Sequence, residues 1–137
     1  MRKLKIGFDI HGVIDDKSDV FSALSKILVD SGNEVHVITG SFRTDELERE
    51  IKEKHNISYT HFFSILDYHK ELGTKIEYDE DGQAWIEGEL WDKTKAEYCQ
   101  RVGIDLHLDD SDSYGDYFLT PYARFYTKDR CRVDLLK

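Results

Sequence analysis

The sequence of 137 residues lacks long apolar runs and contains only one proline, one methionine and two cysteines. No stretch approaches the roughly 20 apolar residues that a membrane-spanning helix needs. The charged start Met1-Arg2-Lys3-Leu4-Lys5 also lacks the apolar segment of a signal peptide, so we expect a cytoplasmic protein. The two cysteines, Cys99 and Cys131, mark no disulfide framework, and Cys99 lies at an apolar helical position typical of a buried thiol.

Basic residues are also scarce relative to acidic ones. Nineteen lysines and arginines stand against 28 aspartates and glutamates, which gives a formal net charge of −9. Nucleic-acid polymers and anionic membranes bind basic surfaces, so we expect neither as the main partner. A small phosphorylated substrate stays compatible with this charge, because a cation held among carboxylates can reverse the local sign. Nothing in the composition indicates an oligomeric state.

Apolar residues with strand periodicity alternate along the chain with apolar residues at helical spacing. Strands are predicted at 4–10, 35–39, 59–63, 104–108 and near 123–126. Four helices are predicted between them. Ser18, Thr44 and Asp92 are placed to cap three of these helices, and the fourth covers 64–72. The pair Asp81-Gly82 predicts a tight hairpin over 76–86.

Alternating strands and helices imply a parallel sheet with helices on both faces. We therefore predict one α/β domain over residues 1–137, built as a three-layer, doubly wound parallel sheet. The segment 75–87 is predicted to be a β-hairpin insertion in that domain. Its small size, and the 30 positions from Asp9 to Thr39, leave no room for a large lid, so we expect a site that is open or shaded by this hairpin.

Polar residues collect where the predicted strands end. Asp9 ends the first strand, Thr39 ends the second and precedes Gly40, and the pair Asp109-Asp110 ends the fourth. In an open parallel sheet these carboxyl ends are where ligands bind. Paired acids repel each other unless a cation intervenes, and Mg²⁺ prefers such oxygen ligands. The predicted helix that starts at Asp92 brings two cations to the same edge, Lys93 and Lys95.

These groups can perform phosphoryl chemistry. Asp9 and Asp109 can hold Mg²⁺ together with a backbone carbonyl, and Lys95 can neutralise Asp9 and the phosphate oxygens. Thr39 can donate a hydrogen bond to a phosphoryl oxygen. Asp9 can then attack phosphorus through its second carboxylate oxygen and form an aspartyl-phosphate.

Four segments carry a resemblance to a known family: Phe8-Asp9-Ile10-His11-Gly12-Val13-Ile14, Val35-His36-Val37-Ile38-Thr39-Gly40, Lys95-Ala96-Glu97 and Leu106-His107-Leu108-Asp109-Asp110-Ser111. In this order they resemble the four motifs of the haloacid dehalogenase-like (HAD) phosphatase superfamily. The resemblance spans nearly the whole chain and implies the Rossmann-like HAD fold. Lys-Ala-Glu before paired acids is similar to nucleotidase-like members with a small cap or none.

The resemblance implies a role for each matched position. Asp9 would be the nucleophile and a metal ligand, and the backbone carbonyl of His11 would be a second ligand. Thr39 and Gly40 would bind the phosphoryl group. Lys95 would be the lysine of the third motif, with Lys93 as the competing candidate. Asp109 and Asp110 would hold Mg²⁺ directly or through water.

One position departs from the family pattern. His11 stands where the family places a second aspartate, which protonates the leaving oxygen and later activates water. An imidazole can do either task near neutral pH, and it does neither if its ring turns away from the site. The leading hypothesis is a Mg²⁺-dependent phosphohydrolase acting on a phosphate monoester, with a nucleotide as one candidate. The alternative is a weakly active or inactive module that binds Mg²⁺ and a phosphorylated ligand.

Other polar and aromatic residues receive less specific interpretations. A receiver-like signalling domain is disfavoured, because receivers place their paired acids early in the chain. His36 and His107 are predicted to be partly buried strand residues, and no histidine spacing suggests zinc. Anion binding and surface placement stay open for Arg43 and Arg124, and substrate contact and core packing stay open for Tyr78 and Trp85.

Overall fold

The computed structural model describes residues 2–125 and contains a five-stranded parallel sheet. Its strands are β1 (Lys5–Phe8), β2 (Glu34–Thr39), β3 (His61–Ser64), β6 (Leu106–Asp109) and β7 (Tyr122–Arg124), in the order β3-β2-β1-β6-β7. The predicted α/β class with a parallel sheet is confirmed, and the order is compatible with a Rossmann-like fold. Cys131 and the end of the last predicted strand lie outside the described residues.

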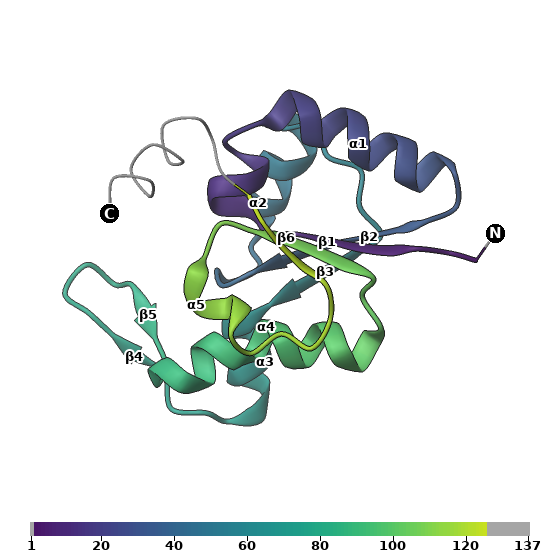
Figure 1. Ribbon diagram of the computed structural model, residues 1–137. Helices are drawn as coiled ribbons and strands as arrows, with labels where there is room; N and C mark the ends of the chain where they lie inside the picture. The colour runs from purple at the N-terminus through teal and green to yellow at the C-terminus, as the bar shows by residue number, and fades with distance from the viewer. Residues whose placement is uncertain (1, 126–137) are drawn as a thin grey trace, which may run out of the picture.

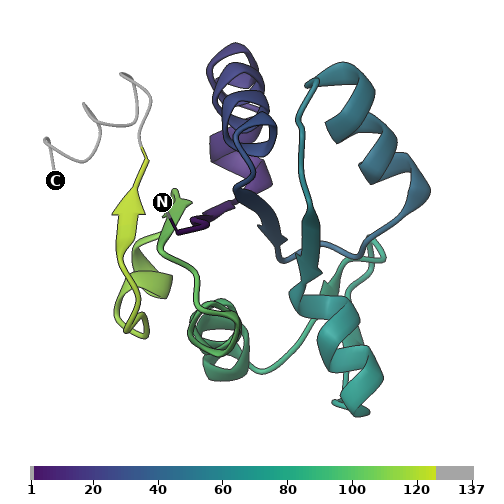
Figure 2. The ribbon, with the colours of Figure 1, turned by 90° about the vertical axis from the view of Figure 1, so that its right-hand side faces the viewer.

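Helices cover both faces of this sheet (Figure 1). The helices α1 (Ser18–Asp30) and α2 (Asp45–Arg49) lie on one face, and α3 (Ile65–Leu72) and α4 (Gly88–Val102) lie on the other, as Figure 2 shows. Side chains alternate along β2, so Val35 and Val37 enter the core on the α1 side of the sheet. Ile38 enters the core on the side of α3 and α4, which also contains the buried Cys99. The wide turns η1 (Ile10–Ile14) and η2 (Glu50–Lys54) and the short α5 (Asp112–Gly115) complete the fold.

The predicted hairpin is present as the antiparallel pair β4 (Glu77–Tyr78) and β5 (Ala84–Trp85). Gly82 has a φ of 81° in its turn, a conformation that favours glycine. In Figure 1 the hairpin projects from the end of the sheet near α4. None of the described helices has the length and apolar character needed to cross a membrane.

Two of the predicted helix caps are wrong. Ser18 is the first residue of α1, and its hydroxyl donates to the carbonyl of Ile14 at 3.0 Å instead of capping the helix. Asp92 lies inside α4, because Glu87 caps that helix by accepting hydrogen bonds from the backbone amides of Glu89 and Leu90. The third predicted cap, Thr44, does accept from the amide of Leu47 at 3.0 Å.

The corrected start of α4 changes the place of the two lysines. Lys93 and Lys95 do not lie in the first turn of a helix but further along α4. Lys95 is fully buried with 1% of its surface exposed, whereas Lys93 is partly exposed. A long side chain in the middle of α4 therefore reaches the sheet edge, and the N-terminus of α4 does not carry it.

Candidate functional site

The site lies at the carboxyl ends of β1, β2 and β6. The connections from β1 lead toward β2 and β3, whereas β6 lies on the other side of β1 and leads to β7. This reversal of direction is where open α/β sheets form a crevice. A cavity of about 460 Å³ occupies the position, and its polar lining includes Asp9, His11, Thr39, Gly40, Ser41, Lys95 and Asp110.

A buried ion-pair group forms the floor of this cavity. The Nζ atom of Lys95 lies 3.0 Å from Asp9 Oδ1 and 2.8 Å from Asp109 Oδ2. All three side chains are at least nine-tenths buried. The structure thus brings together Asp9, Asp109 and Lys95 from β1, β6 and α4, as the sequence predicted.

Burial and charge shift the pKa values of these groups in different directions. Burial raises the pKa of Asp9 to about 7, and repulsion from Asp109 and Asp110 adds to this rise while Lys95 opposes it. Burial alone would raise the pKa of Asp109, but Lys95 and His107 lower it below its usual range. Lys95 keeps a raised pKa despite its burial, because two carboxylates surround it.

His107 is part of this group, which the sequence did not predict. It is fully buried rather than partly buried, and its Nε2 lies 2.9 Å from Asp109 Oδ2. Its ring fits because its register partner on β1 is Gly7, where an added Cβ would lie 2.7 Å from His107 Nδ1. The only signal in the sequence was the spacing, since residues two apart on a strand share a face.

His11 lies at the rim of the cavity on the wide turn η1. Its side chain is 62% exposed, and its Nδ1 lies 3.3 Å from Asp15 Oδ2. The other oxygen of Asp15 accepts from the backbone amide of Gly12 at 2.7 Å, which ties this acid to the turn. Asp15 therefore orients His11, a role that the sequence analysis did not assign.

The phosphate-binding candidates line the cavity beside these acids. Thr39 is buried, and its Oγ1 accepts from the backbone amide of Ser41 at 3.2 Å. The indole of Trp91 packs directly on Gly40, so closely that an added Cβ would be only 2.4 Å from the Cζ2 atom of that ring. Both residues thus lie where the sequence placed them, at the end of β2.

Aromatic side chains also line the cavity, next to Gly40 and Lys95. Trp91 Nε1 donates to the hydroxyl of Tyr114 at 2.6 Å, and both residues line the cavity with Phe42. The sequence analysis missed all three of these aromatic residues, because apolar patterns alone do not separate a cavity wall from a core. Of the residues left open there, Tyr78 and Trp85 are exposed on the hairpin and Arg43 pairs with Glu48. Arg124 lies next to the site, because it pairs with Asp112 and its Nε donates to the backbone carbonyl of Asp110 at 3.4 Å.

The donor set of the site fits a divalent cation. Asp9, Asp109 and Asp110 each offer a carboxylate oxygen, and these oxygens lie within 4.8 Å of one another. Three ionised acids around one ammonium leave a surplus of negative charge, which is consistent with the raised pKa of Asp9. Oxygen donors of this kind suit Mg²⁺. Comparisons with known protein families, with curated proteins and with solved structures found no match.

Proposed function

We propose that this chain is an HAD-like, Mg²⁺-dependent phosphohydrolase that cleaves a phosphate monoester through Asp9. The observation that carries the proposal is the buried Lys95, which bridges Asp9 and Asp109 beneath an open cavity. A lysine ammonium in this position keeps a nucleophilic carboxylate oriented and lowers the charge that an incoming phosphate meets. A buried group with a strongly shifted pKa and a specific charge partner, placed in a cavity, is a typical feature of functional sites.

Asp9 supplies the nucleophile in this proposal. One oxygen of its carboxylate is engaged by Lys95, and the other attacks phosphorus. A bond forms between that oxygen and phosphorus, and the ester bond to the leaving oxygen breaks with its electron pair. His11 gives a proton to the leaving oxygen. Water, after losing a proton to His11, then attacks phosphorus, which releases phosphate and restores the Asp9 carboxylate.

Thr39, Gly40 and Lys95 hold the phosphoryl group in this scheme. The hydroxyl of Thr39 and the backbone amide of Gly40 donate to phosphoryl oxygens at the end of β2. Mg²⁺, held by Asp9, Asp109, Asp110 and the backbone carbonyl of His11, supplies neutralisation of the phosphoryl charge when bound. The aromatic wall of Trp91 and Tyr114 suits a flat leaving group, so a nucleotide is a candidate substrate.

A second candidate function is a module that binds Mg²⁺ and a phosphorylated ligand without turnover. The exposure of His11 favours it, because 62% of this side chain faces solvent and its Nδ1 faces Asp15. A ring in this orientation can transfer a proton only through Nε2, which lies 3.5 Å from Ser41 Oγ, and in this candidate that nitrogen does not reach the leaving oxygen. The two candidates share the ligand site and differ in the chemical step.

The test is phosphate release from a panel of monoesters with Mg²⁺ or with EDTA. We expect Mg²⁺-dependent release that Asp9→Asn abolishes, while Asp16→Asn, the same change at an exposed acid, leaves it intact. Beryllofluoride bound at Asp9 without any turnover would favour the binding module. If the protein shows no phosphate release and no beryllofluoride binding, both candidates are refuted.

A further inference from the structure

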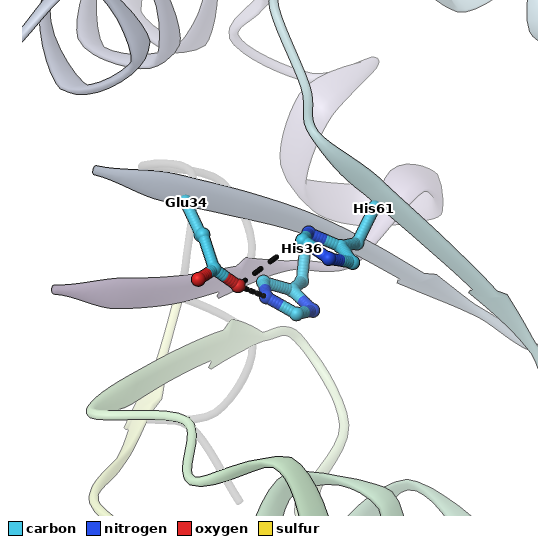
Figure 3. Close-up of side chains that lie close together, drawn as sticks. All are labelled: Glu34, His36 and His61. Carbon is cyan, nitrogen blue, oxygen red and sulfur yellow. Dashed lines mark hydrogen bonds and ion pairs between the residues drawn. The ribbon is translucent and has the colours of Figure 1, made fainter. Parts of the chain in front are cut away.

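A second group of ligand-type side chains lies at the other end of β2. Glu34 is the first residue of that strand, and His36 follows two positions later on the same face. His61 begins the edge strand β3 and is the register partner of His36. Figure 3 shows the three side chains gathered on one face of the sheet, away from the Asp9 cavity at the strand's carboxyl end.

The donor atoms of these residues converge on one carboxylate oxygen. Glu34 Oε1 lies 2.9 Å from His36 Nε2 and 3.5 Å from His61 Nδ1, and the three atoms lie within 4.8 Å of one another. In a tetrahedral zinc site with bonds of about 2.1 Å, neighbouring donors lie about 3.4 Å apart. The second oxygen of Glu34 faces Lys3 at 3.9 Å, which leaves Oε1 directed at the two rings.

His36 is held in an orientation suited to a metal ligand. Only 2% of its surface is exposed, and its Nδ1 lies 2.7 Å from the hydroxyl of Tyr98 on α4. Metal-binding histidines usually have such a partner on the nitrogen that does not face the metal.

We propose that Glu34, His36 and His61 form a binding site for Zn²⁺ or a similar transition-metal ion, with water as the fourth ligand. Two nitrogen donors and one carboxylate favour zinc over magnesium. The glutamate is 17% and the His61 side chain 49% exposed, so water can reach the ion. Because its ligands come from two strands, the ion would hold the edge strand β3 against β2. The proposal is independent of the function proposed for the Asp9 cavity.

Binding requires one local movement. The rings of His36 and His61 are stacked, with centroids 4.2 Å apart and an angle of 4° between their planes. A metal ion lies close to the plane of each ring that binds it, so one ring has to leave the stack. His61 can turn, because it lies on the edge strand. It gives up its stack on His36 and the 2.9 Å contact of its Nδ1 with Thr60 Oγ1, and the ion replaces its 3.5 Å contact with Glu34 Oε1. His36 stays fixed by Tyr98.

The test is a Co²⁺ titration of the full chain, run in parallel on Asp9→Asn so that any ion held by the acids around Asp9 is counted separately. Tetrahedral Co²⁺ absorbs visible light far more strongly than octahedral Co²⁺, so the absorption reports binding in the proposed four-coordinate site, and competition with Zn²⁺ gives the zinc affinity. We expect one tightly bound ion per chain and a loss of more than about 100-fold in affinity for His61→Ala and Glu34→Gln. The control Glu50→Gln removes a carboxylate that faces a different histidine, His55, at 3.6 Å, and should bind normally.

Two further measurements separate a metal site from a simple hydrogen-bonded group. Tyr98→Phe keeps the ring that stacks on Phe63 but loses the hydroxyl, and should weaken Zn²⁺ binding by about tenfold. Zinc should also shift the imidazole NMR signals of His61 and His36. Unchanged binding in both His61→Ala and Glu34→Gln, no Co²⁺ binding by the wild type, or binding abolished only by Asp9→Asn would each overturn the proposal.

Discussion

Lys95 donates a hydrogen bond to Asp9 at 3.0 Å, although 86 positions separate these two residues in the sequence. The same ammonium lies 2.8 Å from Asp109, so one cation serves two buried acids that belong to different strands. A buried carboxylate without a partner is costly, and a buried ammonium is equally so. The folding of α4 against the sheet and the electrostatics of the cavity therefore depend on each other.

Replacing Lys95 should destabilise the protein strongly. Lys95→Met leaves Asp9 and Asp109 buried without their cation, and breaking a buried pair in this way costs about 3–5 kcal/mol. Chemical denaturation in EDTA measures the loss. Lys93→Met changes a partly exposed lysine on the same helix and should stay within about 0.5 kcal/mol of the wild type. Equal unfolding midpoints for Lys95→Met and the wild type would contradict the buried ion pair.

The stability of metal-free Asp9→Asn should increase relative to that of the wild type as pH rises. The pKa of Asp9 rises from an ordinary value of 3.8 to about 7 on folding, so between these values the folded state binds more protons than the unfolded state. The contribution of the Asp9 carboxyl to the free energy of unfolding therefore falls as pH rises from 3.8 to about 7. The difference between variant and wild type, measured by urea denaturation, should increase from pH 4 to 7 and level off above it. A difference independent of pH would exclude the raised pKa.

Mg²⁺ should stabilise the folded protein through the three acids. At a concentration 100 times its Kd, a ligand that binds only the folded state adds about 2.7 kcal/mol. Thermal melts should show a rise in Tm with MgCl₂ that an equal ionic strength of NaCl does not reproduce. Asp110→Asn should reduce this rise, whereas Asp116→Asn, at an exposed acid nearby, should preserve it. The rise should also be greater at pH 8 than at pH 6, since a metal ligand has to be deprotonated.

His11→Asp should raise turnover if the imidazole limits the chemical step. A well-placed general acid or base contributes about 100-fold or more, so a gain of at least tenfold in kcat is expected. Stability should change by less than about 0.5 kcal/mol, because the side chain is 62% exposed. Steady-state kinetics on the best monoester measures the gain, with Asp9→Asn in the same background as the blank. A lower kcat in His11→Asp would show that the imidazole itself performs the proton transfer.

Gly7→Ala should destabilise the core between β1 and β6. An added methyl group would lie 2.7 Å from His107 Nδ1 and 2.8 Å from Ile38 Cδ1, and both side chains are fully buried. Overpacking of this kind costs about 1–3 kcal/mol. Gly88→Ala is the matched control, because its added Cβ at the start of α4 meets nothing within 4 Å. Similar denaturation midpoints for the two variants would show that His107 yields without cost.

Periodicity was sufficient to predict most of the secondary structure. β2, α3 and the hairpin lie within one or two residues of their predicted positions, because apolar spacing and terminal glycines are local signals. The caps of α1 and α4 were wrong for the opposite reason. Glu87 and Asp92 both precede apolar helical residues, and the choice between them depends on the backbone that enters from the hairpin.

The candidate site could be predicted only in part. Asp9, Thr39 and Asp109 were placed correctly, because parallel strands bring their carboxyl ends to one edge. His107 could not be assigned, since its contact with Asp109 depends on the empty space above Gly7 on the neighbouring strand. Trp91 and Tyr114 are 23 positions apart, and only the packing of α5 against α4 makes them one wall.

Local sequence thus determined the identity of the acids and the strand ends that carry them, because hydrophobic periodicity and turn residues act over a few positions. Only the tertiary structure decided which cation meets those acids and how deeply the group is buried. Lys95 reaches the acids from the middle of α4, and no local sequence pattern predicts this contact. Burial and long-range charge set the opposite pKa shifts of Asp9 and Asp109, and both exist only once the helix has packed on the sheet.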